Sequence, residues 1–202
     1  MNITLLDYGA GNVPSVERAL QKLGAQSQRA STADCLNTAD ALILPGVGHF
    51  AALIRALDER NLRAPLLEAL RRGVPFLGIC LGLHALYDSS EEAADLQGLQ
   101  IFPGKIRALS AGVKLPHMGW NQLQLTAKSR LLQGIAPEAY FYFAHSYAVA
   151  ANERTEGVAT CTHGSEFVAV LEHKNINAVQ FHPEKSGAPG AQLLQNFLRL
   201  AA

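Results

Sequence analysis

The 202-residue sequence has little of what marks proteins that bind nucleic acids or membranes. Its 17 lysines and arginines balance its 17 aspartates and glutamates, so no net positive field attracts phosphate backbones or anionic lipids. No run of about 18 apolar residues is present to cross a bilayer. The apolar start at residues 1–6 stops at Asp7 and lacks the basic beginning of a signal peptide. We therefore expect a cytoplasmic protein without nucleic-acid or membrane partners.

Cysteine is also scarce, and its three copies are too widely spaced to indicate a metal site. Cys35, Cys80 and Cys161 are odd in number, and no two lie close enough in the sequence to act as paired zinc ligands. We expect free thiols in a reducing compartment, no metal and no cofactor. With 49% apolar and 17% charged residues, the composition is that of a folded globular protein, and the length predicts a single domain over residues 1–202.

The first half of the sequence alternates strands and helices. Short apolar runs predict buried strands at residues 3–6, 41–44 and 74–79. Helical spacing follows each run and predicts helices at residues 13–23, 50–72 with an interruption near 61–65, and 81–88. Such alternation predicts an α/β fold with a doubly wound, mostly parallel central sheet.

The alternation of strands and helices ends after Gly98. Short segments rich in β-branched and aromatic residues predict extra, largely antiparallel strands in the C-terminal half, at residues 101–102, 140–143, 147–149, 158–161, 167–171 and 176–181. Apolar residues at helical spacing predict a last helix at residues 191–198, docked on the sheet.

The strongest local signal for chemistry is the segment Gly78-Ile79-Cys80-Leu81-Gly82. Small residues two before and two after a nucleophile permit the sharp strand-to-helix turn of a nucleophile elbow. The turn exposes Cys80 and places its sulfur at a helix N-terminus, where the helix dipole favours thiolate over thiol. The alternative is a buried structural cysteine at the end of a strand.

A second signal is the segment Phe181-His182-Pro183-Glu184. Proline favours an extended conformation for the residue before it, and residues two apart in an extended segment project to the same side. Glu184 is thereby placed to accept a hydrogen bond from one imidazole nitrogen of His182 and to leave the other nitrogen free. A surface turn is the alternative, and the sequence alone does not show that His182 meets Cys80.

A glycine loop, Pro45-Gly46-Val47-Gly48, follows the second predicted strand directly. It is placed to turn a backbone N–H towards a developing oxyanion, beside the N–H of Leu81. A plain strand-to-helix turn explains the same residues, because glycine loops without a fixed spacing are weak evidence.

Five segments, read together and in order, resemble one family. They are residues 44–50 (LPGVGHF), 78–82 (GICLG), 116–121 (PHMGWN), 142–147 (YFAHSY) and 180–186 (QFHPEKS). They resemble the glutaminase subunits of imidazole glycerol phosphate synthases, the HisH family of class I (triad) glutamine amidotransferases, whose fold is flavodoxin-like. Residues 7–12 (DYGAGN) resemble the opening of the same family, so the resemblance covers nearly the whole chain.

The resemblance implies a glutaminase that serves a second subunit. Cys80 attacks the side-chain amide of glutamine, His182 shuttles the proton and Glu184 holds the imidazole. Water releases glutamate from a γ-glutamyl thioester. Ammonia passes to a cyclase subunit, a HisF-type β/α barrel bound as a heterodimer, which makes imidazole glycerol phosphate and aminoimidazole carboxamide ribotide in histidine biosynthesis.

Further roles follow from position in the family's motifs. The resemblance implies oxyanion donors at Val47, Gly48 and Leu81, and a glutamine site that includes Gly46, His84, Glu92, His145, Ser146 and Tyr147. It implies a partner interface at Asn12, Trp120, Asn121, Tyr142 and Lys185, with core packing as the alternative for the aromatic residues.

One position departs from the family's pattern. The family usually has methionine and glutamine after the elbow glycine, where this chain has Leu83 and His84. Leucine conserves the volume of methionine. We expect His84 to weaken glutamine positioning, because one imidazole tautomer cannot offer both the donor and the acceptor of an amide. The alternative is an imidazolium that stabilises the thiolate.

Other functions fit parts of the pattern. The glutaminase can serve another synthase, in vitamin B6 synthesis or surface-sugar amidination. It can be a binding partner that lost turnover through His84, or a cysteine hydrolase that acts alone. The hypothesis of a glutaminase subunit differs from that of a hydrolase acting alone. It predicts little glutaminase activity until the partner binds its ligand, because the loop at residues 46–48 would gate the active site.

Overall fold

The computed structural model describes residues 1–9, 11–30, 32–110, 112–151 and 157–202. Ala10, which belongs to the opening motif, lies outside the described residues. The main sheet has eight strands in the order β2-β1-β3-β4-β14-β13-β12-β9. Its first five strands are parallel and the last three are antiparallel. The parallel strands are β1 (Ile3–Leu6), β2 (Ser27–Ala30), β3 (Ala41–Gly46), β4 (Phe76–Cys80) and β14 (Ile176–Val179).

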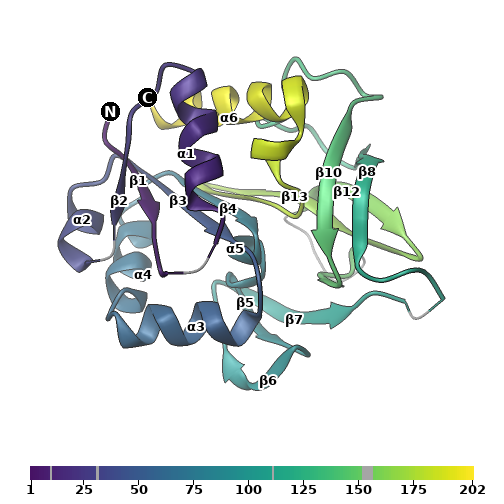
Figure 1. The fold of residues 1–202 in the computed structure, drawn as a ribbon, viewed down its shortest axis with the longest axis horizontal. Coiled ribbons are helices and arrows are strands. Elements are labelled where there is room, and N and C mark those ends of the chain that lie inside the picture. The colour runs from purple at the N-terminus through teal and green to yellow at the C-terminus, as the bar shows by residue number, and fades with distance from the viewer. Residues whose placement is uncertain (10, 31, 111, 152–156) are drawn as a thin grey trace.

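Four of the parallel strands, β1, β3, β4 and β14, are buried along their whole length because helices cover both faces of the sheet. Figure 1 shows α1 (Val13–Lys22) and α6 (Gly187–Ala201) on one side, and α3 (Phe50–Glu59) and α4 (Arg63–Arg71) on the other. Ile43 packs in the cluster that contains α1 and α6, whereas its neighbours Leu42 and Leu44 pack with α3 and α4. The order of the five parallel strands is that of a flavodoxin-like fold, which confirms the predicted fold class.

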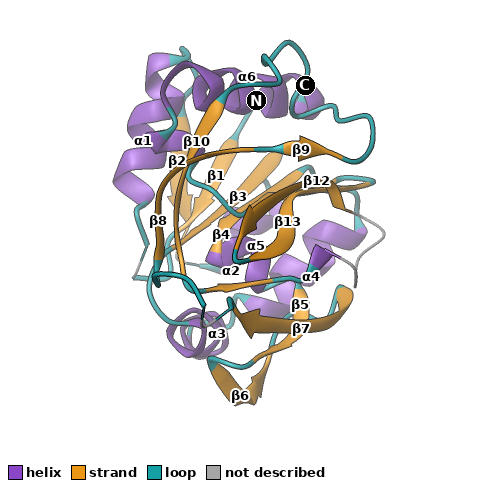
Figure 2. Ribbon diagram, turned by 90° about the vertical axis from the view of Figure 1, so that its right-hand side faces the viewer, coloured by secondary structure: helices purple, strands orange, loops and turns teal. Residues whose placement is uncertain are grey.

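Antiparallel strands extend the C-terminal half, as predicted. Within the main sheet they are β9 (Gln124–Leu125), β12 (Gly157–His163) and β13 (Ser165–His173). Two smaller sheets lie beside it (Figure 2). One pairs β8 (His117–Gln122) with β10 (Tyr140–His145); the other contains β5 (Tyr87–Ser90), β6 (Ala93–Gln97), β7 (Phe102–Ala108) and β11 (Tyr147–Ala148).

Several predicted boundaries are wrong. The helix expected at residues 81–88 is only α5 (Leu81–His84), and β5 begins three residues later. Pairing of β5 with β6 and β7 overrides the local helical pattern. The interruption expected within residues 50–72 is present, and Asn61 has a φ of 55° there. The last helix begins at Gly187, four residues earlier than predicted.

Five α-helices or β-strands of the described residues have no predicted helix or strand at their position: β2, α2 (Ala33–Asn37), β6, β8 and β9. Only Ala30 of β2 is buried, so this edge strand lacks an apolar run. The short helix α2 buries only Leu36. Among the described residues, no helix is long and apolar enough to cross a membrane.

Candidate active site

The parallel strands bring the candidate residues to one edge of the sheet. Val47 follows β3, Cys80 ends β4, and His182 comes shortly after β14. Because β3, β4 and β14 are neighbouring parallel strands, their carboxyl ends meet at the same edge, where ligands bind in open α/β sheets.

Cys80 sits on a strained turn of the kind that the glycine spacing predicts. Its φ of 53° and ψ of −103° are unusual for a residue other than glycine. The flanking glycines make room for the turn: a Cβ on Gly78 would lie 2.7 Å from the Gly82 carbonyl oxygen, and a Cβ on Gly82 would lie 2.0 Å from the Leu44 carbonyl oxygen. Any side chain at either position would therefore force the strand and helix apart.

His182 and Glu184 form a buried pair beside the sulfur. The Nδ1 atom of His182 lies 3.0 Å from Oε1 of Glu184, and the two side chains are 2% and 1% exposed. Burial opposes the charged imidazolium, but hydrogen bonds to Cys80 and Glu184 outweigh it and raise the pKa of His182 to about 10. The arrangement therefore favours a protonated His182 next to the Cys80 sulfur.

A cavity of about 160 Å³ opens at this site. It is smaller than the roughly 300–1,000 Å³ of sites for drug-sized ligands, so it suits a small substrate. The predicted residues that line it are Val47, Gly48, Cys80, Leu81, His84, Glu92, His145, Ser146, Tyr147, His182 and Lys185. Gly46 does not line it; it ends β3 opposite Cys80, where a Cβ would lie 2.5 Å from the Leu81 Cβ.

Charged groups of both signs face this cavity. Glu92 anchors itself by accepting a 2.7 Å hydrogen bond from the Phe50 backbone N–H at the start of α3. Lys185 also lines the cavity, at the end of the 3-10 helix Pro183–Lys185. A carboxylate and an ammonium group on one small cavity match the ammonium and carboxylate of a free amino acid.

Tyr8 is a buried residue next to the glycine loop. Burial is the main cause that raises the pKa of its phenol, and no described residue forms a hydrogen bond with its hydroxyl group. The Tyr8 hydroxyl and the Pro45 carbonyl oxygen lie 3.2 Å and 3.4 Å from the point that a Cβ on Gly11 would occupy.

Histidines behind the cavity form an ordered chain of neutral rings. His145 Nδ1–H donates to the Tyr147 carbonyl oxygen at 2.9 Å, so its Nε2 accepts from Nδ1 of His117 at 3.0 Å. The Nε2 atom of His117 then accepts from the side-chain amide of Asn121. Burial is the main cause that lowers the pKa of His117 to about 4 and that of His145 to about 3.

Of the predicted interface residues only Lys185 lines the cavity, and Tyr142 and Trp120 lie next to it. Tyr142 and Trp120 pair across β10 and β8 with ring centroids 5.9 Å apart, and the Lys185 ammonium lies 5.6 Å from the Tyr142 ring centroid. Asn12 occupies the N-cap position of α1, where its backbone carbonyl oxygen accepts from the Ser15 N–H, while its side chain forms no capping hydrogen bond. Asn121 uses its side chain within the chain, donating to the Thr162 carbonyl oxygen at 3.1 Å.

Two residues next to the nucleophile were not predicted from the sequence. Tyr8 is one, and Gln180 is the other: it is completely buried, and its amide nitrogen lies 3.6 Å from the Cys80 sulfur. Gln180 belongs to the segment QFHPEKS, but no periodicity in the sequence distinguishes it from a core residue. His84 contacts Gln180 and lines the cavity. Burial lowers the pKa of His84 to about 4, so its ring is neutral and does not supply the imidazolium considered above.

The sequence matches the model of the family "Glutamine amidotransferase class-I" over residues 4–201. It is 45% identical over 195 residues to the imidazole glycerol phosphate synthase subunit HisH of Desulfitobacterium hafniense, covering 96% of this chain and 92% of the relative. It is 45% identical over 199 residues to that of Methanothermobacter thermautotrophicus, covering 98% of each chain. The hisHF protein of Arabidopsis thaliana is 42% identical over 200 residues, which are 97% of this chain and 34% of that protein.

Solved structures share the fold at lower identity. A crystal structure of a glutamine amidotransferase superposes with a TM-score of 0.78 at 18% identity, covering 98% of each chain. PurLQS from Thermotoga maritima superposes with a TM-score of 0.75 at 19% identity, covering 100% of this chain and 99% of that one. The chain belongs to the class I glutamine amidotransferases and, within them, to the family of HisH subunits.

Proposed function

We propose that this protein is the glutaminase subunit of an imidazole glycerol phosphate synthase, acting as one domain over residues 1–202. The observation that carries the proposal is the meeting of Cys80 and His182 at one small cavity, with Glu184 bound to the His182 ring, although 102 positions separate Cys80 from His182 in the sequence. The names of relatives at 45% identity over nearly the full length support the same activity.

In the proposed reaction, the Cys80 thiolate attacks the side-chain carbonyl carbon of glutamine. Backbone N–H groups of Val47, Gly48 and Leu81 stabilise the oxyanion, and the His182 imidazolium protonates the departing amine. The C–N bond breaks, ammonia leaves and a γ-glutamyl thioester remains. Neutral His182 then takes a proton from water, which attacks the thioester, releases glutamate and restores the thiolate. Glu184 holds the imidazole in the required tautomer throughout.

Two opposite charges orient the substrate. Glu92 binds the α-ammonium group of glutamine and Lys185 binds its α-carboxylate, while His145, Ser146 and Tyr147 complete the wall behind it. The cavity's size and its mixed charge support glutamine as the substrate. Gly46 acts indirectly, by letting the loop after β3 approach Leu81 closely.

The partner is a cyclase subunit of β/α-barrel fold, bound as a heterodimer on the face formed by β8 and β10. That face exposes large apolar side chains: Met118 is 66% exposed, Trp120 55% and Tyr140 52%, as expected for an interaction surface. It adjoins the active site, because the backbone N–H of His182 donates to the Tyr142 carbonyl oxygen at 2.8 Å. The name hisHF of the longer plant relative supports pairing of these two activities.

A glutamate assay tests the proposal. The chain is incubated with glutamine, a cyclase subunit and the ligand of that subunit, and compared with Cys80→Ala and with the matched control Cys161→Ala. We expect turnover in the wild type and the control, none in Cys80→Ala, and much lower turnover without the cyclase subunit. Equal rates with and without that subunit would favour a hydrolase that acts alone, and no turnover in any mixture would refute the proposal.

A further inference from the structure

Gln180 makes two side-chain contacts that the reaction above does not use. It follows β14 and is completely buried. Its Nε2 atom donates towards the Cys80 sulfur at 3.6 Å, and its Oε1 atom lies 2.7 Å from Nε2 of His84. Both ends of one buried amide are therefore occupied, one by the nucleophile and the other by the residue that departs from the family's pattern.

Hydrogen-bond chemistry fixes the direction of both contacts. An amide oxygen only accepts, so His84 must carry its proton on Nε2. His84 is neutral, so this is its single N–H group. A thiolate also only accepts. If the amide of Gln180 were reversed, its oxygen would face the sulfur and two acceptors would meet in a buried site.

We propose that Gln180 is a second hydrogen-bond donor to the Cys80 thiolate, and that His84 is the positioning residue that holds the Gln180 amide in the donating orientation. The inference rests on the proposed role of Cys80 as nucleophile. With His182 as the first donor, two donors from different parts of the chain converge on the sulfur. Loss of one donor to a charged sulfur should therefore lower the acid dissociation constant of the Cys80 thiol about tenfold or more, which is about one pKa unit.

The proposal also assigns a different role to His84 from the one expected from the sequence. The glutamine usual at this position in the family can donate an amide N–H to Gln180 as an imidazole does. Histidine therefore preserves the contact, and its effect is on the nucleophile rather than on the affinity for glutamine.

Alkylation of the full-length chain tests the proposal without glutamine or partner. The rate of Cys80 modification by iodoacetamide is followed by peptide mass spectrometry from about pH 5 to about pH 10, which separates Cys80 from the other two cysteines. The variants are Gln180→Leu, Gln180→Glu, His84→Leu and His84→Gln, with Gln192→Leu on α6 as the matched control. None of the variants replaces the other titratable residues around the sulfur, which are Tyr8, Glu92, His145, His182, Glu184 and Lys185.

We expect Gln180→Leu and His84→Leu to move the midpoint of the alkylation profile up by about one pH unit. Gln180→Glu should move it further, because a carboxylate replaces the donor, and it decides the question if Gln180→Leu fails to fold. His84→Gln and Gln192→Leu should keep the wild-type midpoint. Unchanged midpoints in both folded Gln180 variants would overturn the proposal, and an unchanged midpoint in His84→Leu alone would overturn the role of His84.

Steady-state kinetics with the cyclase subunit separate this role from substrate binding. His84→Leu should lower kcat about tenfold and leave KM for glutamine within about twofold. A rise in KM at constant kcat would instead place His84 against the substrate and overturn the positioning role. If the wild type does not hydrolyse glutamine while the alkylation shifts are seen, the proposed function fails and the hydrogen-bond arrangement stands.

Discussion

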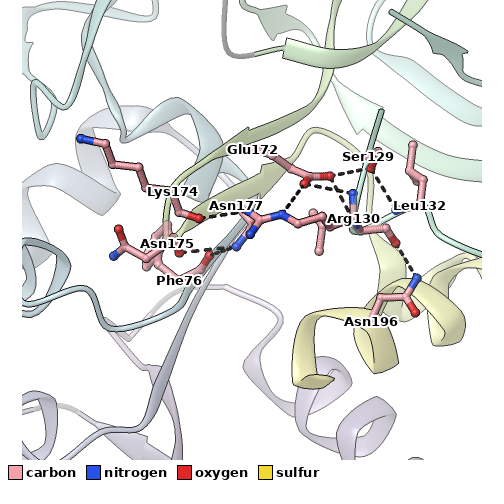
Figure 3. A network of polar contacts seen from close by, with 10 residues as sticks. Phe76, Ser129, Arg130, Leu132, Glu172, Lys174, Asn175, Asn177 and Asn196 are labelled. Carbon is pink, nitrogen blue, oxygen red and sulfur yellow. Dashed lines mark hydrogen bonds and ion pairs between the residues drawn. The ribbon is translucent and has the colours of Figure 1, made fainter. Parts of the chain in front are cut away.

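Glu172 and Glu184 are both buried carboxylates, with side chains 6% and 1% exposed, but the regions around them satisfy them differently. Glu172, at the end of β13, accepts from the Ser129 hydroxyl, the backbone N–H groups of Arg130 and Leu131, and the Arg130 guanidinium. Figure 3 shows these groups converging on it, with Asn196 of α6 bound to the same segment. Glu184 accepts from His182, and no described residue donates to its Oε2 atom.

The difference separates anchoring from catalysis. Glu172, with four hydrogen-bond donors, fixes the position of the loop at Ser129 and takes no part in proton transfer. A carboxylate with one proton partner directs its whole charge to that partner, here the imidazole that must gain and lose a proton in each cycle. Removing Glu172 should therefore change stability, and removing Glu184 should change rate.

The largest effect is expected for Glu184→Gln. The amide keeps the shape but loses the charge and the tautomer control, so kcat for glutamine hydrolysis should fall about 10³- to 10⁴-fold. The free energy of unfolding, measured by denaturant titration, should change by less than about 1 kcal/mol. A large loss of stability at near-normal kcat would show that Glu184 anchors the fold as Glu172 does.

Glu172→Gln should show the converse. Loss of a charge that binds four donors in a buried site should lower the free energy of unfolding by about 3 kcal/mol. The kcat of the remaining folded protein should stay within about twofold of wild type, since the network lies away from the cavity residues. Active-site titration with an alkylating glutamine analogue corrects for the folded fraction, and a tenfold fall in corrected kcat would contradict the distinction.

Acid should weaken the region around the active site through its neutral histidines. Folded-state pKa values of about 4 for His84 and His117 and about 3 for His145 lie below the ordinary 6.5. Unfolded chains therefore bind more protons below pH 6.5. The contribution of these neutral rings to the free energy of unfolding is fully present above pH 6.5 and is lost as the pH falls towards 4. At pH 5 the loss is on the order of 2 kcal/mol per ring.

Denaturant titrations at about pH 7 and pH 5 measure this loss. His117→Phe keeps a ring between Phe143 and His163 and should lose less stability on acidification than the wild type. His49→Asn, which changes an exposed histidine at the start of α3, should lose as much as the wild type. Equal losses in all three proteins would show that His117 is not among the groups responsible.

The smallest effect is expected for Ser129→Ala. It removes one of the donors to Glu172 and leaves the others, so the free energy of unfolding should fall by about 1 kcal/mol. The matched change Ser110→Ala removes an exposed hydroxyl that accepts from the nearby Gly112 backbone N–H and should cost less. A fall for Ser129→Ala as large as that of Glu172→Gln would mean that the hydroxyl, rather than the carboxylate, organises the network.

The sequence predicted the features that depend on local spacing. Apolar runs located β1, β3 and β4, glycine spacing located the elbow at Cys80, and the His-Pro-Glu segment located a pair whose atoms lie 3.0 Å apart. Motif resemblance found most of the residues that line the cavity.

The features that it missed depend on contacts between distant segments. Residues 87–90 became β5 because β6 and β7 pair with it. Gln180 reaches Cys80 across 100 positions of sequence, and Glu172 meets the loop at Ser129 across 43. Neither contact can be recognised from periodicity or composition, because the pairing of distant strands brings these side chains together.

The close packing at the nucleophile's turn has a consequence for protein engineering. A methyl group at position 78 or 82 would collide with main-chain atoms, which cannot swing aside as a flexible side chain does. Random libraries that include these two codons will yield almost entirely inactive clones there. New acceptor specificities are better sought by varying Met118 and Tyr140 on the exposed face, where substitutions leave the turn undisturbed.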